Sequence, residues 1–362
     1  MKNIFLLLLS ISSVTFAQNF DNTDGIEVNI FQGNIYAHSP EMVHLITGHP
    51  KSFMVSWYKK THGNQEWQSL YNYPDYGAYF LYQNFQNQVL GENYAVGGFY
   101  NFYFLKRNLV FKISEGIALA SNPYNYEYNY KNNAFGTKFL ANINFGLNYT
   151  RENLFGNFGI NAGMMFTHYS IGRIKSPNSG LNTYNLNFGI TYSFATVENK
   201  IDTISAKLSS KLPLNYNFAF RTGINQSPVI GSDQYPFFNL SFFVGKRLNK
   251  KSGLQLGTEL FLTLSDKEYI KYLSIAYPEK GVDSDTDYKK MAIFAGYEQF
   301  IHRFSFELQL GYYFYDPLNL DTPYYNRLGS KYYFTPKFSV GVSVKAHGTM
   351  AEAVEFGIGY QI

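Results

Sequence analysis

Three polar residues, His168, Ser170 and Asn182, are predicted to lie on one face of a strand hairpin. In residues 159–170 apolar side chains alternate with small or polar ones, and His168 and Ser170 fall in the apolar series. Asn182 has the parity of the next apolar series, which begins at Tyr184. Because successive side chains of a strand point to opposite faces, an imidazole, a hydroxyl and an amide converge at one end of the hairpin.

The face that carries these residues is otherwise apolar, and in a membrane barrel such a face contacts lipid. A strongly polar side chain there costs about 2–4 kcal/mol at the bilayer midplane and only about 0–1 kcal/mol near the interface. His168 beside Tyr169 therefore also fits a plain interfacial position, and parity alone leaves this alternative open.

The surrounding sequence resembles the lipid A 3-O-deacylase family of outer-membrane barrels. That family has a His-x-Ser pair, a Pro-Asn step eight residues on, and an acidic residue four positions after that Asn. His168, Ser170, Pro177 and Asn178 match in type and spacing, within residues 155–194. The whole chain also resembles the longer acyloxyacyl hydrolase-like proteins of Bacteroidetes-type bacteria. Since the family's usual barrel has eight strands, the second half of this chain is then an extension.

The resemblance implies ester hydrolysis. Ser170 is then the nucleophile and His168 the general base that activates it. Asn182 stands where the family has a Glu that holds the imidazole. An Asn can orient a histidine, but it brings no charge to offset the imidazolium that forms during catalysis.

The loop between the two strands completes the predicted site. Asn178, with backbone amides near Gly172, is expected to support the oxyanion, although a turn residue after a proline is an equally good description of Asn178. Arg173 and Lys175 are candidate contacts for lipid A phosphates, or plain solvated charges. Ile171 departs from the family, which usually has Asn there.

Period-two alternation is the main structural signal along the chain. Four segments show it clearly over about 10 residues, with apolar residues on one face and Asn, Gln, Glu or Gly on the other: residues 139–149, 254–262, 304–314 and 354–362. Such strands are longer than those of soluble sandwiches, and several end in Tyr or Phe, as the aromatic girdles of membrane barrels do. Glu259, Glu307 and Glu355 fall on the lumen face.

Short and long connections alternate along the chain, as periplasmic turns and extracellular loops do. Short ones are expected near residues 106–108, 150–154, 249–251, 301–303 and 335–337, and long ones near 122–138, 171–181, 265–288 and 316–326. The spacing predicts an all-β protein, a transmembrane antiparallel β-barrel of about 16 strands, with 12–14 also possible. No linker that would divide the chain is evident, so residues 18–362 are expected to form a single outer-membrane barrel.

Residues 1–17 have the pattern of a secretory signal peptide. Lys2 precedes an apolar run at residues 4–9, and small residues end at Ala17 before Gln18. No later run of about 18 apolar residues occurs, so helical spans are not expected. The predicted location is therefore the bacterial outer membrane.

Composition restricts the remaining classes of function. The chain contains 33 Tyr, 34 Phe and 30 Gly, a mixture that favours strands over helices. With no Cys, disulfides and thiolate metal sites are excluded. A net charge of +4 without a basic stripe gives no basis for nucleic-acid binding.

Two further groups of residues have no strong chemical interpretation. His38, His44 and His49 share one polar stretch, but their spacing matches no metal signature, and neither a metal nor a cofactor is predicted. Glu115 has the apolar parity between Ile113 and Ile117, and a β-bulge that turns it into the lumen is the favoured explanation.

Two functions remain as hypotheses. In the first, an outer-membrane esterase removes an ester-linked acyl chain from lipid A in the outer leaflet. In the second, a non-catalytic barrel (a porin, a hydrophobic-compound channel or a scaffold) carries a degenerate motif, and a lumen of about 16 strands is wide enough for a channel.

Overall fold

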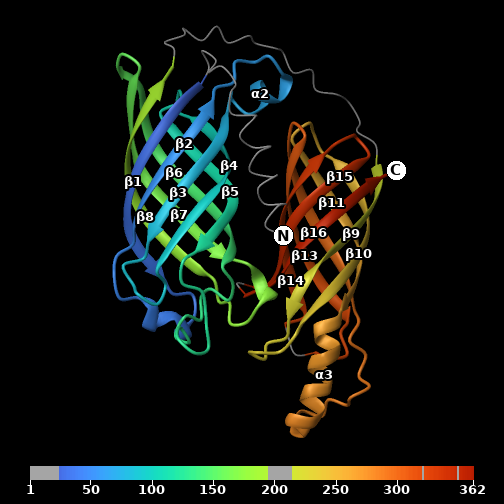
Figure 1. The fold of residues 1–362 in the computed structure, drawn as a ribbon. Helices are drawn as coiled ribbons and strands as arrows, with labels where there is room; N and C mark the ends of the chain where they lie inside the picture. Colours follow the sequence, from blue (N-terminus) through green and yellow to red (C-terminus); the bar gives the residue numbers. More distant parts are fainter. Residues whose placement is uncertain (1–23, 195–213, 320–321, 349) are drawn as a thin grey trace, which may run out of the picture.

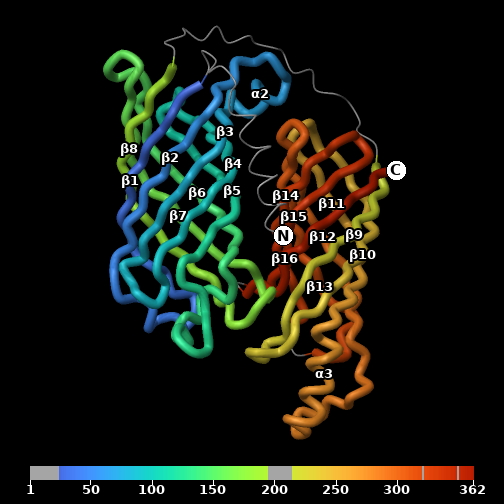
Figure 2. The backbone as a smooth tube through the Cα atoms, viewed as in Figure 1, coloured from blue at the N-terminus to red at the C-terminus, as the bar shows by residue number. Residues whose placement is uncertain are grey.

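The chain folds into two closed antiparallel β-barrels of eight strands each. The structure is a computed structural model, and it describes residues 24–194, 214–319, 322–348 and 350–362. Figure 1 shows the two barrels side by side, and Figure 2 traces the backbone through both. The predicted signal peptide lies outside the described residues.

The first barrel comprises the strands up to residue 193. In chain order these are β1 (Asp24–Tyr36), β2 (Lys51–Lys59), β3 (Asp75–Asn84), β4 (Glu92–Phe104), β5 (Leu109–Ala120), β6 (Phe139–Phe155), β7 (Phe158–Ser170) and β8 (Leu181–Ser193). Pairing of β1 with β8 closes the ring along 12 residue pairs, from Gly25↔Ser193 to Tyr36↔Asn182.

The second barrel begins at residue 214. Its strands are β9 (Leu214–Gln226), β10 (Gln234–Arg247), β11 (Ser252–Thr263), β12 (Lys290–Ile301), β13 (Phe304–Tyr315), β14 (Tyr324–Tyr333), β15 (Phe338–His347) and β16 (Met350–Gln361). Pairing of β9 with β16 closes this ring along only six residue pairs, from Phe356↔Thr222 to Gln361↔Asn217.

The all-β class, the antiparallel pairing and the number of 16 strands are confirmed. The expectation of one ring without a dividing linker is corrected, because β8 turns back to pair with β1 instead of continuing to β9. The first barrel ends with β8 at Ser193, and the second begins with β9 at Leu214. Alternation defines the two faces of each strand, but it does not say which strands pair, and so it could not reveal where a ring closes.

The predicted faces are confirmed on both barrels. On β6, Phe139, Leu147 and Tyr149 are exposed on the outside, whereas Asn142 and Asn144 are buried in the lumen. On β13, Leu308 and Leu310 are exposed and Glu307 is buried. Glu259 and Glu355 also face the second lumen, as expected.

Side chains fill both lumens, because an eight-stranded ring is just wide enough to hold them. The middle of the first lumen is rich in amides and hydroxyls, for example Tyr79 Oη donating to Asn142 Oδ1 at 2.8 Å and Asn144 Nδ2 to Ser114 Oγ at 3.0 Å. The second lumen holds ion pairs, centred on fully buried Arg327, which contacts Glu259 Oε2 at 2.7 Å and Glu355 Oε2 at 2.6 Å.

Glu115 corrects a second expectation. The pairing of β5 is continuous through this residue, with Gly98 on one side and Ile143 on the other, so no bulge turns it inward. Its carboxyl group instead keeps the outward parity and lies beside the side chain of Ser330 on β14 of the second barrel. The outward parity of a charged residue thus indicates a contact between barrels.

Long connections gather at one end of both barrels, which we call the long-loop end. It carries η1 (Pro40–Leu45), residues 121–138, η2 (Gly172–Ile174), α3 (Leu264–Ala276) and η3 (Pro278–Lys280). The opposite, short-turn end carries mainly tight turns, although α2 (Glu66–Leu70) lies there too. None of the helices in the described ranges is long and apolar enough to cross a membrane.

Candidate functional site

Three neighbouring strands place the predicted site at the long-loop end of the first barrel. His168 on β7 is the register partner of Asn182 on β8, and Asn182 is the partner of Tyr36 on β1. Ser170 follows two residues after His168, where it pairs with Ala141 on β6. Because partners in register lie side by side, the predicted residues share the outer face at one height of the barrel.

His168 and Asn182 are in direct contact. The ring nitrogen Nδ1 of His168 lies 2.5 Å from Asn182 Oδ1. The other end of the same amide, Asn182 Nδ2, lies 3.1 Å from Nδ1 of His38, a residue just beyond the end of β1. The Nε2 atom of His38 lies 2.9 Å from the carbonyl oxygen of Ser179. Four residues from three segments therefore form one continuous chain of polar contacts.

The hydroxyl of Ser170 is held by two donors from the following loop. The backbone N–H of Gly172 donates to Ser170 Oγ at 3.3 Å, and Asn178 Nδ2 donates to the same oxygen at 3.1 Å. Only 7% of the Ser170 surface is exposed. Among the described residues, no hydrogen bond joins this hydroxyl to the His168 ring. A general base need not touch its nucleophile before substrate binds, because catalytic hydrogen bonds are often loose in the free enzyme.

Asn178 and Gly172, the residues predicted to support the oxyanion, therefore both lie within hydrogen-bond distance of Ser170 Oγ. Asn178 also donates to the carbonyl oxygen of Gly172 at 2.8 Å and accepts from the backbone N–H of Gly136 at 3.4 Å. Gly172 has a left-handed backbone with φ +61°, which glycine adopts at little cost. The backbone N–H of Gly172 and the side-chain amide of Asn178 both point at Ser170 Oγ. A tetrahedral oxyanion would form next to this atom.

The loop that joins β7 to β8, residues 171–180, is called the site loop. Neighbouring loops of the first barrel fix its conformation. The N–H groups of Ser179 and Gly180 donate to the carbonyl oxygens of Asn133 and Ala134 at 2.9 and 3.0 Å. A Cβ atom on Gly136 would lie 2.1 Å from the carbonyl oxygen of Lys175, so the two segments pack backbone against backbone.

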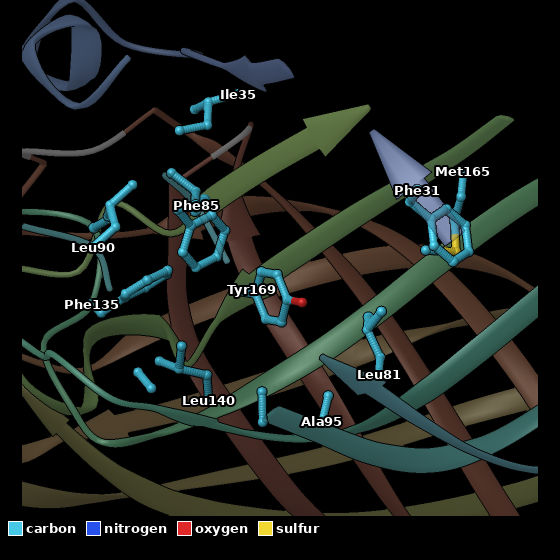
Figure 3. Close-up of a cluster of buried hydrophobic side chains, with 14 of the residues drawn as sticks. Phe31, Ile35, Leu81, Phe85, Leu90, Ala95, Phe135, Leu140, Met165 and Tyr169 are labelled. Atoms are coloured by element: carbon cyan, nitrogen blue, oxygen red, sulfur yellow. The ribbon is translucent and has the colours of Figure 1, made fainter. Parts of the chain in front are cut away.

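Under these loops, the lumen is closed by a cluster of buried apolar side chains, shown in Figure 3. Tyr169, which lies between His168 and Ser170 in the chain, points inward and packs against Phe85 and Phe135 at ring-centroid distances of 6.0 and 6.4 Å. The outward-facing site therefore rests on a rigid inner support.

The second barrel contacts the site loop at the part of β9 and β16 where these two strands do not pair with each other. Ser176 N donates to Gln226 Oε1 at 2.6 Å, and Gln234 Nε2 donates to the carbonyl oxygen of Ile174 at 2.5 Å. A Cβ atom on Gly172 would lie 3.2 Å from the backbone of Ala353. The loop thus packs on β9 and β16 beyond the six residue pairs that join them.

The two predicted phosphate contacts have different surroundings. Arg173 extends toward the second barrel, where its Nη2 atom lies 4.0 Å from Glu352 Oε1. Lys175 is exposed on the loop. Of the pair, Lys175 is better placed to reach an anionic group outside the protein.

His38 is the site residue that sequence reasoning missed. It was considered only with His44 and His49, which lie elsewhere in the structure: His44 Nε2 contacts the carbonyl oxygen of Lys131 at 2.7 Å, and His49 Nδ1 contacts Asn34 Oδ1 at 2.7 Å. The described residues contain no cluster of three or more potential metal ligands. Parity alone could not have found His38, because the position of Tyr36, two residues earlier, beside Asn182 depends on the pairing of β1 with β8.

Comparison with known proteins identifies a family for each barrel. Residues 51–191 match the lipid A 3-O-deacylase family, and residues 214–362 match the C-terminal domain of acyloxyacyl hydrolases. No curated protein matches the chain.

Solved structures with similarity to the chain include a porin, an outer membrane protein and a siderophore receptor. A Rhodopseudomonas blastica porin variant is 10% identical, covers 94% of this chain and 100% of its own, and has a TM-score of 0.20. Omp33 of Acinetobacter baumannii is 8% identical, with coverages of 94% and 99% and a TM-score of 0.18. The siderophore receptor PirA of the same organism is 11% identical, with coverages of 91% and 43% and a TM-score of 0.23. TM-scores this low carry no argument about the arrangement or function of this chain.

Proposed function

We propose that this chain, which belongs to the lipid A 3-O-deacylase family through its first barrel and to the acyloxyacyl hydrolases through its second, is a serine esterase of the outer membrane. Its substrate is lipid A, from which it releases an ester-linked fatty acid. The observation that carries this proposal is the outward position of His168, Ser170 and Asn182 at the long-loop end. A substrate that is itself a membrane lipid reaches a site on the outside of a barrel without leaving the leaflet.

In the first half of the reaction, Ser170 Oγ attacks the ester carbonyl carbon while His168 Nε2 takes the hydroxyl proton. The carbonyl oxygen becomes an oxyanion beside the Gly172 N–H and Asn178 Nδ2, which already point at Ser170. Cleavage of the carbon–oxygen bond releases the sugar hydroxyl, which takes the proton from His168. The acyl chain is left on Ser170.

In the second half, water attacks the acyl-enzyme and His168 again accepts and returns the proton. The products are a free fatty acid and the regenerated Ser170 hydroxyl. Lys175, exposed beside the site, is suited to pair with a lipid A phosphate during both halves.

Ser170→Ala tests the proposal. The variant removes the nucleophile, and we expect fatty-acid release from lipid A to fall by at least about 10³-fold. Mass spectrometry of lipid A from cells that express the wild type or the variant measures the loss of one acyl chain. The same substitution at Ser330, an outward-facing serine of β14, is the matched control and should leave cleavage unchanged. Identical lipid A with and without the wild-type protein would refute the proposal.

The structure gives less support to a channel than the sequence did. That hypothesis depended on one wide ring, whereas each ring has eight strands and a lumen filled by side chains.

A further inference from the structure

The polar chain at the site ends on a group that can only accept a hydrogen bond. The carbonyl oxygen of Ser179 has no proton, so His38 Nε2, at 2.9 Å, must be the donor. A neutral imidazole carries one N–H, so Nδ1 of His38 is then an acceptor. Its partner at 3.1 Å, Asn182 Nδ2, is a donor of the side-chain amide.

The same logic continues to His168. With Asn182 Nδ2 directed at His38, Asn182 Oδ1 faces His168 Nδ1 at 2.5 Å. That oxygen is only an acceptor, so the proton of neutral His168 lies on Nδ1. Nε2 of His168 is then unprotonated and able to accept the proton of a serine hydroxyl. The carbonyl oxygen of Ser179 thus determines the positions of the protons that join His38, Asn182 and His168.

The orientation of the Asn182 amide, with its oxygen facing His168, matters because Asn182 alone could not select it. The two ends of an amide have nearly the same shape, and a flipped Asn182 would present a donor to His168 and favour the wrong tautomer. The Glu found at this position in the family avoids the problem, since an ionised carboxylate only accepts. In this chain another group has to select one orientation of the amide.

We propose that His38 is the positioning residue that selects this orientation, so that the pair Asn182–His38 performs the tautomer-fixing role of the missing carboxylate. This inference rests on the proposed function, because it assigns His38 to the same reaction. His38 touches neither the nucleophile nor the oxyanion donors. It acts only through Asn182.

Local structure supports a stable position for His38. Tyr36, two residues earlier, is the register partner of Asn182, so the strand ladder brings His38 to the amide. At the other end, Ser179 is itself fixed, because its N–H donates to the carbonyl oxygen of Asn133 at 2.9 Å. His38 is half-buried, so water competes only partly for its ring nitrogens.

The first test is the order of activity among His38 variants of the full chain. In His38→Asn, the side-chain oxygen replaces Nδ1 as the acceptor for Asn182, but the contact to Ser179 is lost. In His38→Gln, only the donor to Ser179 is kept, in place of Nε2. His38→Leu keeps neither contact. We expect kcat on lipid A to fall in the order wild type, His38→Asn, then His38→Gln and His38→Leu together. The loss for Leu should be on the order of 10²-fold, the lower end of what a general base contributes. A steric role for His38 would instead leave Gln, which is closer in size, above Asn.

The second test uses the background of Asn182→Asp, which restores an acceptor-only group. There, His38→Leu should cost less than about threefold in kcat, because a carboxylate needs no help to select the tautomer. An equal loss in both backgrounds would overturn the proposal.

The third test does not depend on activity. ¹⁵N NMR of histidine-labelled protein in detergent micelles distinguishes the two neutral tautomers. We expect Nδ1–H for His168 and Nε2–H for His38 in the wild type, and a mixture for His168 in His38→Leu. Nε2–H for His168 in the wild type would refute the relay even if lipid A is cleaved. The expected tautomers without any cleavage would refute the proposed function alone.

Discussion

The two barrels have the same number of strands but differ in what holds them closed. Twelve residue pairs close the seam of the first barrel and only six close that of the second. The middle of the first lumen contains mainly amide and hydroxyl contacts, although Lys112 and Glu27 also form a buried ion pair there, whereas Arg327, Glu259 and Glu355 form a buried ionic centre in the second. The barrel with the complete seam carries the candidate site, and the barrel with the short seam supports its loop. The comparison shows that one ring size accommodates two different kinds of interior.

The largest expected effect tests the difference between the interiors. Arg327→Met removes the ion pair of buried Glu355 and one of the two ion pairs of buried Glu259, and should lower the unfolding free energy of the second barrel by about 3–5 kcal/mol. The matched change in the first barrel, Asn144→Ala, removes neutral hydrogen bonds and should cost only about 1 kcal/mol. Equal losses would show that the ionic centre is not what distinguishes the second barrel.

Tryptophan fluorescence during urea unfolding in lipid vesicles separates the two barrels in this measurement. Trp57, on β2, reports on the first barrel, and Trp67→Phe is used as the background because Trp67 contacts His302 of the second barrel. Phe242→Trp, at an outward position of β10, adds a reporter to the second barrel.

The next effect tests the support that the second barrel gives to the site loop. Gln226 is 3% exposed and accepts from the Ser176 N–H, so Gln226→Leu leaves a buried donor unpaired. An unpaired buried donor costs about 1–3 kcal/mol, and we expect the kcat for fatty-acid release to fall by about tenfold. Gln234→Leu removes an exposed contact to the same loop and should change kcat by less than about twofold. If both variants match the wild type, the second barrel does not position the loop.

The smallest effect concerns the contact at the short-turn end. His302, in the turn between β12 and β13, stacks on Trp67 of α2 with ring centroids 5.9 Å apart. Burial, and then the charge of Arg303, lower the pKa of His302 below its ordinary value of 6.5. His302 therefore binds a proton more readily when it is separated from Trp67 than when it is stacked on it. The contact is fully present above pH 6.5 and weakens as the pH falls below this value.

Fluorescence of Trp67 in a Trp57→Phe background measures this pH dependence. We expect a change in the emission of Trp67 between pH 7 and 5, and His302→Gln should remove it. A change of the same size in His302→Gln would assign the titration to another group.

Most of the fold was predictable because strand alternation is a local property of the sequence. Each outward Phe or Leu and each inward Asn or Glu depends only on the parity of its own strand, as on β6 and β13. Ring closure depends on pairs such as Tyr36 and Asn182, which are far apart in the chain, and no local pattern encodes them. Glu115 was wrongly placed in the lumen because an outward charge was taken as unfavourable, whereas the second barrel supplies Ser330 as its partner.

The candidate site was predictable to the same extent. His168, Ser170 and Asn182 were proposed from parity, and Asn178 and Gly172 from the loop motif. The structure places them in two hydrogen-bonded groups, His168 with Asn182, and Ser170 with Gly172 and Asn178. His38 could not be found, because its contact with Asn182 spans 144 residues and a loop conformation. The position of the loop against Gln226 depended on a second ring that the sequence did not reveal.

The packing of β16 against the site loop restricts how a lipid diffusing in the plane of the leaflet arrives at Ser170. The second barrel lies against the first beside Glu115 and covers the approach over Gly172, where Ala353 is in contact. The outer surfaces of β7, β8 and β1 are exposed, and β8 and β1 lie on the side of the first barrel away from the second in Figure 1. This surface presents exposed Met164, Leu186 and Ile30 to the acyl chains. A lipid that moves along this surface therefore encounters the site by two-dimensional diffusion, with its acyl chains against apolar side chains and its headgroup level with the long loops.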